Sequence, residues 1–237
     1  MICVNEQCEN NFNKCFMEYT AFSEQPLKLA PVPGTIGFRH WDSAMIEKMG
    51  NFQPSDIVAD IGGGRSYLLP FLSSRIALGY IIDLGVTGKI TTYRDWYKTY
   101  FCLDSFLDGK FVTLRVDARE LPFKDDYLDK VITVSAFEHF DMECTNDPDG
   151  DIKAAIEVFR TLKPGGLFLG TVDFNPYTER PKGTTRAYTY NSFEKRIMEP
   201  AGFELYGGYK RYDFGQLNTD YIVQPLFFVL VKPLKGN

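Results

Sequence analysis

The 237-residue sequence predicts an α/β fold built on a mostly parallel sheet, and three observations support this prediction. Short apolar segments rich in Val, Ile and Phe alternate with segments of helical periodicity from about residue 50 onward. The first apolar segment ends in an acid and three consecutive glycines, which is typical of a turn from a strand into a helix. Near the end of the chain, a short polar loop separates two further strand-like segments.

Five short apolar segments are expected to form parallel strands. They read as continuous apolar runs, so both faces of the sheet should be covered by other elements. The predicted strands are residues 57–61, 78–83, 111–116, 130–135 and 167–172.

Three helices are predicted between and after these strands. The first, over residues 65–74, starts from the glycine turn. The second, over residues 151–162, repeats apolar residues at helical spacing until a Lys-Pro-Gly-Gly sequence stops it. The third begins at Asn191, whose spacing to Glu194 is that of a capping box, and runs towards Pro200.

Both ends of the chain add to this core. Residues 203–212 and 221–231 are predicted to form an antiparallel terminal hairpin, because a parallel pair would need a longer connection. Residues 1–50 carry aromatic side chains among prolines and glycines, and they are expected to form an N-terminal helical cap or simply one or two further packed helices. The chain therefore divides into a helical cap segment, residues 1–50, and a main domain, residues 51–237.

The composition is that of a folded globular protein. Hydrophobic residues make up 44% and charged residues 24% of the chain. No apolar run approaches the length of a membrane helix, and the N-terminus is too polar for a signal peptide. The cysteines form no paired metal-binding motif, and the formal net charge of −5 disfavours nucleic acid as a partner. We expect a cytoplasmic protein that binds neither membrane nor nucleic acid.

Three successive predicted strands end in an aspartate, at Asp60, Asp83 and Asp117. In an open parallel sheet, ligands bind at the edge where the carboxyl ends of the strands meet. Three glycines after Asp60 permit a tight turn and close approach of a ligand to the backbone. An acid placed like Asp83 accepts hydrogen bonds from ribose hydroxyls, and one placed like Asp117 can accept from an exocyclic amine. The pattern indicates a nucleoside, while the turn lacks the residues of a dinucleotide fingerprint or a P-loop.

This series of motifs resembles the class I S-adenosylmethionine-dependent methyltransferases, in particular those that act on small molecules. The resemblance covers about residues 50–231. It implies a Rossmann-like, doubly wound, mostly parallel sheet of seven strands with an antiparallel last strand, and S-adenosylmethionine as the cofactor. The cofactor-binding residues that it implies are Asp60, Gly62, Gly63, Gly64, Asp83, Leu84, Asp117, Ala118 and Ser135.

Methyl transfer from a sulfonium mainly requires alignment of the acceptor and, for a hydroxyl, removal of a proton. His139 directly follows the fourth predicted strand, so it is the candidate catalytic base; the alternative is a histidine that packs beside the cofactor. No metal is expected, because Ser135 and apolar residues follow that strand where metal-dependent relatives place carboxylates. Candidate contacts to the acceptor are His40, Glu138, Asp173 and Tyr188.

The acceptor is expected to be a small metabolite or sugar derivative that is methylated on oxygen. Basic and tyrosine side chains mix in residues 175–190, and such mixtures bind anionic or sugar-like groups; a solvated charged loop is the alternative. N- or C-methylation and a non-catalytic nucleoside-binding or scaffold subunit are alternative functions. A nicotinamide-dependent oxidoreductase is disfavoured by the missing third glycine. The chain is expected to act as a monomer or homodimer.

Overall fold

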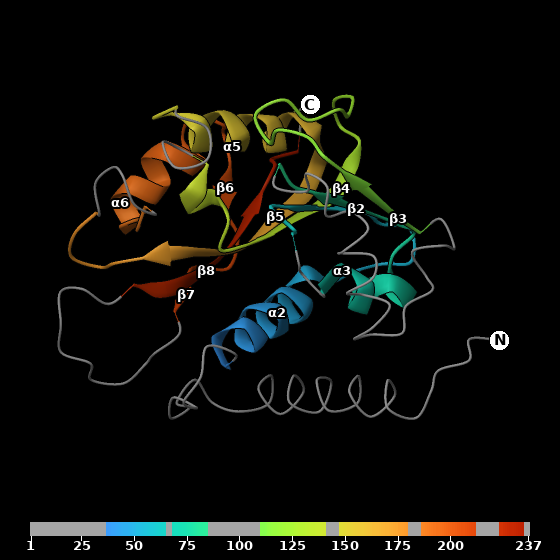
Figure 1. Cartoon of the computed structure of the whole chain (residues 1–237), viewed down its shortest axis with the longest axis horizontal. Coiled ribbons are helices and arrows are strands. Elements are labelled where there is room, and N and C mark those ends of the chain that lie inside the picture. Colours follow the sequence, from blue (N-terminus) through green and yellow to red (C-terminus); the bar gives the residue numbers. More distant parts are fainter. Residues whose placement is uncertain are drawn as a thin grey trace.

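The computed structural model of the protein describes residues 37–64, 68–84, 110–140, 147–179, 186–211 and 223–234. Within these ranges a mixed β-sheet forms the central layer, with helices on both faces (Figure 1). The strand order is β3-β2-β1-β4-β5-β8-β6, and β7 pairs with β8. This order confirms the predicted doubly wound, mostly parallel α/β fold with an antiparallel last strand.

The first five strands pair in parallel. They are β1 (Ile57–Ile61), β2 (Leu78–Ile82), β3 (Phe111–Leu114), β4 (Leu128–Val134) and β5 (Leu162–Phe174). β5 begins at Leu162 rather than at Leu167, because its pairing with β4 tolerates an irregularity in which Gly165 has a φ of 79°. All five strands overlap the predicted ones, and their carboxyl ends lie at one edge of the sheet.

The C-terminal strands pair antiparallel. β8 (Gln224–Val231) lies beside β5 and runs antiparallel to it, as predicted. The single strand predicted over residues 203–212 is instead two short segments, β6 (Glu204–Leu205) and β7 (Lys210–Arg211), each paired with β8. The glycines at positions 207 and 208 have φ angles of 75° and 80°, so the chain leaves the extended conformation between the two segments.

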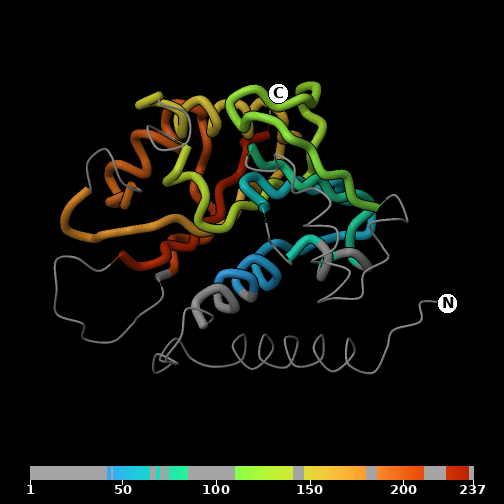
Figure 2. Tube along the Cα trace, viewed as in Figure 1, coloured from blue at the N-terminus to red at the C-terminus, as the bar shows by residue number. Residues whose placement is uncertain are grey.

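Helices cover both faces of the sheet, and the tube in Figure 2 shows the two helical layers on either side of it. One face carries α2 (Gly37–Gly50), α3 (Leu68–Phe71) and the 3-10 turn η1 (Leu72–Arg75). The other face carries α5 (Gly150–Thr161), α6 (Tyr190–Phe193) and the π-helical turn η4 (Glu194–Met198). Among the described residues, these helices are all too short or too polar to cross a bilayer.

The cap of α6 corrects one prediction. Thr189, rather than Asn191, is the N-terminal cap of this helix. The Thr189 hydroxyl accepts from the backbone N–H of Ser192 at 3.1 Å, and the Ser192 hydroxyl accepts from the backbone N–H of Thr189 at 2.9 Å. Two hydroxyl side chains thus form the capping box in place of the predicted amide and carboxylate.

Two hydrophobic cores lie on the two faces of the sheet. Neighbouring residues of one strand enter opposite cores, for example Phe168 and Leu169 of β5, or Phe227 and Phe228 of β8. Helix α2 contributes Ile46 to the core on its face and contacts β4, β5 and β8. Of the predicted N-terminal cap segment, the structure describes this helix, which packs on a sheet face; residues 1–36 lie outside the described residues.

Lys232, just after β8, closes the C-terminal end of α5. Its Nζ donates to the carbonyl oxygens of Phe159 at 2.8 Å and Leu162 at 2.7 Å, and it lies 2.6 Å from Asp126 Oδ1. Carbonyls at a helix C-terminus lack a donor within the helix. Because Lys232 is buried, it supplies the donor that water would otherwise provide.

We expect Lys232→Met to lower the free energy of unfolding by about 2 kcal/mol, because Asp126 and buried carbonyls lose a charged donor. Denaturant unfolding followed by circular dichroism measures this change. Lys163→Met is the matched control: the Lys163 side chain is 42% exposed and pairs with Asp129 at 2.7 Å, so its loss should cost about 0.5 kcal/mol. Equal losses in the two variants would contradict the prediction.

Candidate active site

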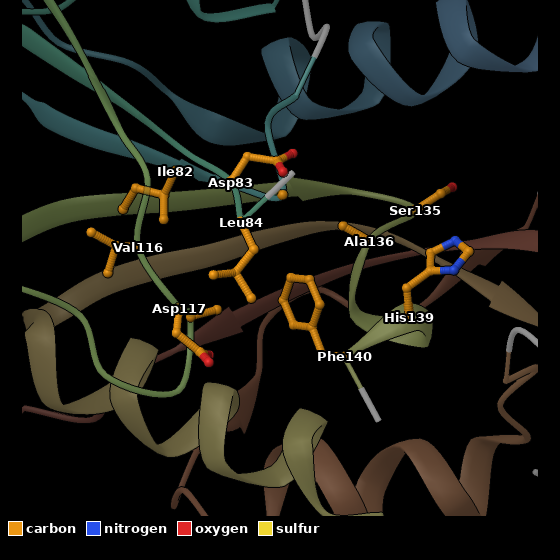
Figure 3. Close-up of a pocket in the computed structure, with 11 residues that line it drawn as sticks. Ile82, Asp83, Leu84, Val116, Asp117, Ser135, Ala136, His139 and Phe140 are labelled. Atoms are coloured by element: carbon orange, nitrogen blue, oxygen red, sulfur yellow. The ribbon is translucent and has the colours of Figure 1, made fainter. Parts of the chain in front are cut away.

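A pocket lies at the carboxyl ends of β1, β2, β3 and β4. It is lined by Gly62, Ile82, Asp83, Leu84, Val116, Asp117, Ala118, Ser135, Ala136, His139 and Phe140. Figure 3 shows Asp83 and Asp117 on one side of the pocket and His139 on the other, with the Phe140 ring between them. The structure therefore brings most of the predicted cofactor residues together with the predicted base.

Close packing shapes the turn after β1. Gly62 has a φ of 70°, and a Cβ on this residue would lie 2.3 Å from the Cβ of Ala136. The Gly62 N–H donates to the carbonyl oxygen of Ile82 at 2.8 Å, which fixes the turn against β2. Two pocket walls thus approach each other at a point where only glycine fits.

Three predicted cofactor residues do not line this pocket. Asp60 is buried in β1, and a Cβ on Gly63 would lie 2.9 Å from its Cγ. A Cβ on Gly64 would lie 3.0 Å from Asp83 Oδ2. The two glycines therefore leave room for the two acids, and Asp60 lies beneath the turn. Direct contact of these three residues with a cofactor stays a prediction.

Asp117 follows β3 and is held by a neighbour that the sequence analysis missed. Arg119 donates from Nη2 to Asp117 Oδ2 at 2.6 Å and from its backbone N–H to Oδ1 at 2.9 Å. The side-chain hydrogen bond from Arg119 holds the pKa of Asp117 below its usual value. The carboxylate on this side of the pocket is therefore ionised and fixed in place.

A sharp turn after β4 presents His139 to the pocket. Ser135 has a φ of 45°, and its N–H still donates to the Thr171 carbonyl of β5 at 2.9 Å. The chain then enters the 3-10 turn η3 (Phe137–His139), in which the His139 N–H donates to the carbonyl of Ala136 at 3.0 Å. Ser135 and the His139 imidazole end up on the same side of the pocket (Figure 3).

Of the predicted acceptor contacts, Glu138, Asp173 and Tyr188 are not among the residues that line this pocket. Glu138 and Tyr188 are fully buried, and the Tyr188 hydroxyl donates to Asp151 Oδ2 at 2.8 Å. Burial and the Asp151 charge raise the pKa of Tyr188 well above its usual value, so this hydroxyl stays protonated. Asp173 lies within β5, and the side chain of His40 in α2 lies outside the described residues. Glu138 and Tyr188 therefore lie in the interior, and their contact with an acceptor stays a prediction.

Sequence reasoning also missed the apolar part of the pocket wall. Ile82 and Val116 each stand directly before a predicted strand-end acid, and this position is the signal that could have identified them. Ala136 and Phe140 carry no such signal, because they read as ordinary core residues. The described residues contain no group of three or more His, Cys, Asp or Glu side chains placed to hold a metal ion.

Comparison with known proteins points to one family. Residues 60–170 match a methyltransferase domain. The ubiquinone/menaquinone biosynthesis C-methyltransferase UbiE from Vibrio parahaemolyticus is 30% identical over 159 residues, which cover 66% of this chain and 56% of that protein. The chain thus spans little more than half the length of this curated relative.

Solved structures share the fold. The 1,6-didemethyltoxoflavin-N1-methyltransferase from Burkholderia thailandensis was solved with bound 1,6-didemethyltoxoflavin and S-adenosylhomocysteine. The match covers 95% of this chain and 87% of that chain, with a TM-score of 0.62 and 12% identity. A SAM-dependent methyltransferase from Aquifex aeolicus covers 80% of this chain and 89% of its own, with a TM-score of 0.55 and 18% identity. Residues 60–170 therefore belong to the methyltransferase domain family, and the matched domain, the sheet order and the UbiE relatives support the class I S-adenosylmethionine-dependent type.

Proposed function

We propose that this chain transfers a methyl group from S-adenosylmethionine to the oxygen of a small molecule that carries an ionisable hydroxyl. The observation that carries the proposal is the arrangement of the pocket, with Asp83 and Asp117 on one side and His139 on the other. Two acids suit the ribose and the base of a nucleoside. A histidine suits removal of a proton from an acceptor. One pocket thus offers a cofactor side and an acceptor side.

The residues present fit this cofactor. Gly62 lines the pocket and carries no side chain, so a ligand can approach its backbone closely. Asp83 would accept hydrogen bonds from the ribose hydroxyls, and Asp117 from the amino group of adenine. When bound, S-adenosylmethionine supplies a methyl group on a positively charged sulfur that is a good leaving group. Apolar contacts to the faces of the purine would come from Ile82, Leu84, Val116 and Phe140.

We assign to His139 the removal of the proton from the acceptor hydroxyl. A hydroxyl oxygen attacks more readily as its proton leaves, and an imidazole takes up protons near neutral pH. The 3-10 turn η3 holds the histidine on the pocket wall, and the side chains of Ala136 and Phe140 beside it are apolar. The acceptor hydroxyl is therefore proposed to lie between His139 and the methyl donor.

Methylation on carbon is a second candidate, because the curated relative UbiE is named a C-methyltransferase. A carbon next to an ionised hydroxyl on an aromatic ring is a nucleophile, so the same base serves both reactions. The product distinguishes them: O-methylation consumes the hydroxyl, whereas C-methylation leaves it free.

The remaining predictions about partners stand as proposals. The net charge of −5 supports a small-molecule acceptor over nucleic acid. Cytoplasmic location, action without a membrane or a metal, and a monomeric or homodimeric state are likewise part of the proposal.

Calorimetric titration of the full chain tests the cofactor. We expect S-adenosylmethionine and S-adenosylhomocysteine to bind. Asp83→Ala should lower the affinity for both compounds by about 10- to 100-fold, because hydrogen bonds to a charged group are lost. Asp125→Ala is the matched control, since that carboxylate is 75% exposed and lies outside the pocket lining. Binding of NAD in place of the sulfur nucleosides would refute the proposal.

An acceptor screen tests the reaction. Pools of phenols and sugar derivatives are incubated with the protein and S-adenosylmethionine, and mass spectrometry detects the added methyl group. Nuclear magnetic resonance of the product then assigns the methyl group to oxygen or carbon. Cofactor binding without transfer to any hydroxyl compound would favour a nucleoside-binding scaffold subunit.

A further inference from the structure

Arg119 lies at the centre of a small charged cluster beside the pocket. Its Nε lies 3.0 Å and 3.1 Å from the two carboxylate oxygens of Asp117, and its Nη2 lies 2.6 Å from Oδ2. On the other side, its Nη1 donates to Asp147 Oδ2 at 3.1 Å, and Lys153 donates to that same oxygen at 2.6 Å. The guanidinium therefore joins an acid of the pocket wall to an acid that precedes α5.

These contacts use most of the acceptor capacity of Asp117. A carboxylate offers about four lone-pair positions. The backbone N–H and Nη2 of Arg119 each donate to one oxygen and Nε is shared between both, so three donors occupy about three of these positions. The Asp117 side chain nonetheless remains 29% exposed and lines the pocket. About one acceptor position is therefore left for a ligand, and Arg119 decides where it points.

The planar guanidinium sets the orientation of the Asp117 carboxylate as well as its electrostatic environment. A fork of N–H donors fixes the plane of the bound carboxylate, which a lysine ammonium cannot do. Asp147 in turn limits the rotation of the guanidinium, because it holds Nη1 from the opposite side. Asp147 thus orients the Arg119 guanidinium, and the guanidinium orients the Asp117 carboxylate.

We propose that Arg119 is a positioning residue that aims the free acceptor position of Asp117 at an exocyclic amino group, and so makes the pocket prefer adenine over hypoxanthine in the bound nucleoside. The inference rests on the proposed function, because it takes S-adenosylmethionine as the ligand. Hypoxanthine carries a carbonyl oxygen where adenine carries its amino group, and two acceptors facing each other repel. The Asp117 carboxylate cannot rotate away from that repulsion while Arg119 holds it, whereas it could rotate if Arg119 were removed.

Calorimetry with S-adenosylhomocysteine and S-inosylhomocysteine tests this inference on the full chain. The wild-type protein should bind the adenosyl compound about 10- to 100-fold more tightly, the difference that one hydrogen bond to a charged group supplies. Arg119→Met should lower the affinity for the adenosyl compound about 10-fold and change the affinity for the inosyl compound by no more than about 2-fold. The preference for adenine would then be largely lost. Arg119→Lys should keep the charge without restoring the preference, because the ammonium lacks the fork.

Two further variants separate the possible outcomes. Arg115→Met is the matched control, because this arginine is exposed on the same segment outside the pocket lining, and it should leave both affinities unchanged. Asp147→Asn keeps every Asp117 contact and should reduce the preference by a smaller factor, which provides the test if Arg119→Met fails to fold.

Equal weakening of both nucleosides by Arg119→Met and Asp147→Asn, or an unchanged preference in both variants, would overturn the role of Arg119. A wild-type protein that binds S-adenosylhomocysteine without preference over the inosyl compound would also overturn it. A wild-type protein that binds neither compound would overturn the proposed function itself.

Discussion

Asp151→Asn is expected to lower the free energy of unfolding by about 3 kcal/mol, because it removes the fully buried carboxylate that Arg196 and Arg186 share and leaves them only the more exposed Asp149 and Glu179. Asp151 is fully buried in the first turn of α5. Its carboxylate accepts from Arg196 Nε at 2.9 Å and Nη2 at 2.6 Å and from the Tyr188 hydroxyl at 2.8 Å. Arg186 Nε lies 3.7 Å away. Asparagine keeps the shape of the side chain, so the loss of unfolding free energy reports the effect of removing the charge alone.

Two comparison variants make the measurement specific. Tyr188→Phe removes one neutral donor and leaves both arginines paired, so we expect a loss of about 1 kcal/mol. Asp149→Asn removes a carboxylate that is 58% exposed and 3.5 Å from Arg196, and it should cost at most about 0.5 kcal/mol. Urea unfolding of the four proteins gives the free energies. A loss below about 1 kcal/mol in Asp151→Asn would show that water or rearrangement compensates the arginines.

His139→Gln is expected to lower kcat about 10²- to 10⁴-fold with the acceptor found in the screen, because the proposed base is lost. Glutamine fills a similar space and can form hydrogen bonds, but it does not take up a proton. The affinity for S-adenosylhomocysteine should stay within about 2-fold, since Asp83 and Asp117 lie on the other side of the pocket. Stopped assays of product formation, with calorimetry in parallel, measure the two quantities.

The pH dependence separates a base from a packing residue. In wild type the rate should level off with rising pH, because the base already removes the proton of the acceptor. In the variant it should keep rising with pH, because hydroxide and ionisation of the acceptor replace the missing base. The deficit should therefore shrink at alkaline pH. A constant ratio of the two rates at every pH would assign His139 a role in packing only.

The strands were predictable because their signals are local. Apolar β-branched runs mark buried parallel strands. β1 matches residues 57–61, β4 is shifted by one or two residues at each end, and β5 is longer at both ends than predicted. The break between β6 and β7 was not foreseen, although the glycines at 207 and 208 were visible. Whether a glycine pair interrupts a strand depends on the partner strand, here β8, and the partner is not visible in a local pattern.

The cofactor side of the pocket was more predictable than the acceptor side. Asp83 and Asp117 stand at strand ends, where the topology of a parallel sheet brings them together. Glu138 was a candidate acceptor contact because it precedes His139, and Tyr188 because it stands among basic and tyrosine side chains; the structure buries both. The burial of Tyr188 depends on Asp151, which is 37 residues away in the chain, and Arg119 became visible as a partner of Asp117 only through its contact geometry.

The place of β8 in the sheet has a consequence for biosynthesis. In the described part of the chain β8 is the last strand to leave the ribosome, yet it lies between β5 and β6. Until residues 224–231 emerge, β5 presents an unpaired edge and the short β6 has no strand to pair with. Completion of the sheet is therefore a late, long-range event on the nascent chain. A pause in translation before residue 224 would prolong the time during which the β5 edge is open to pairing with another chain.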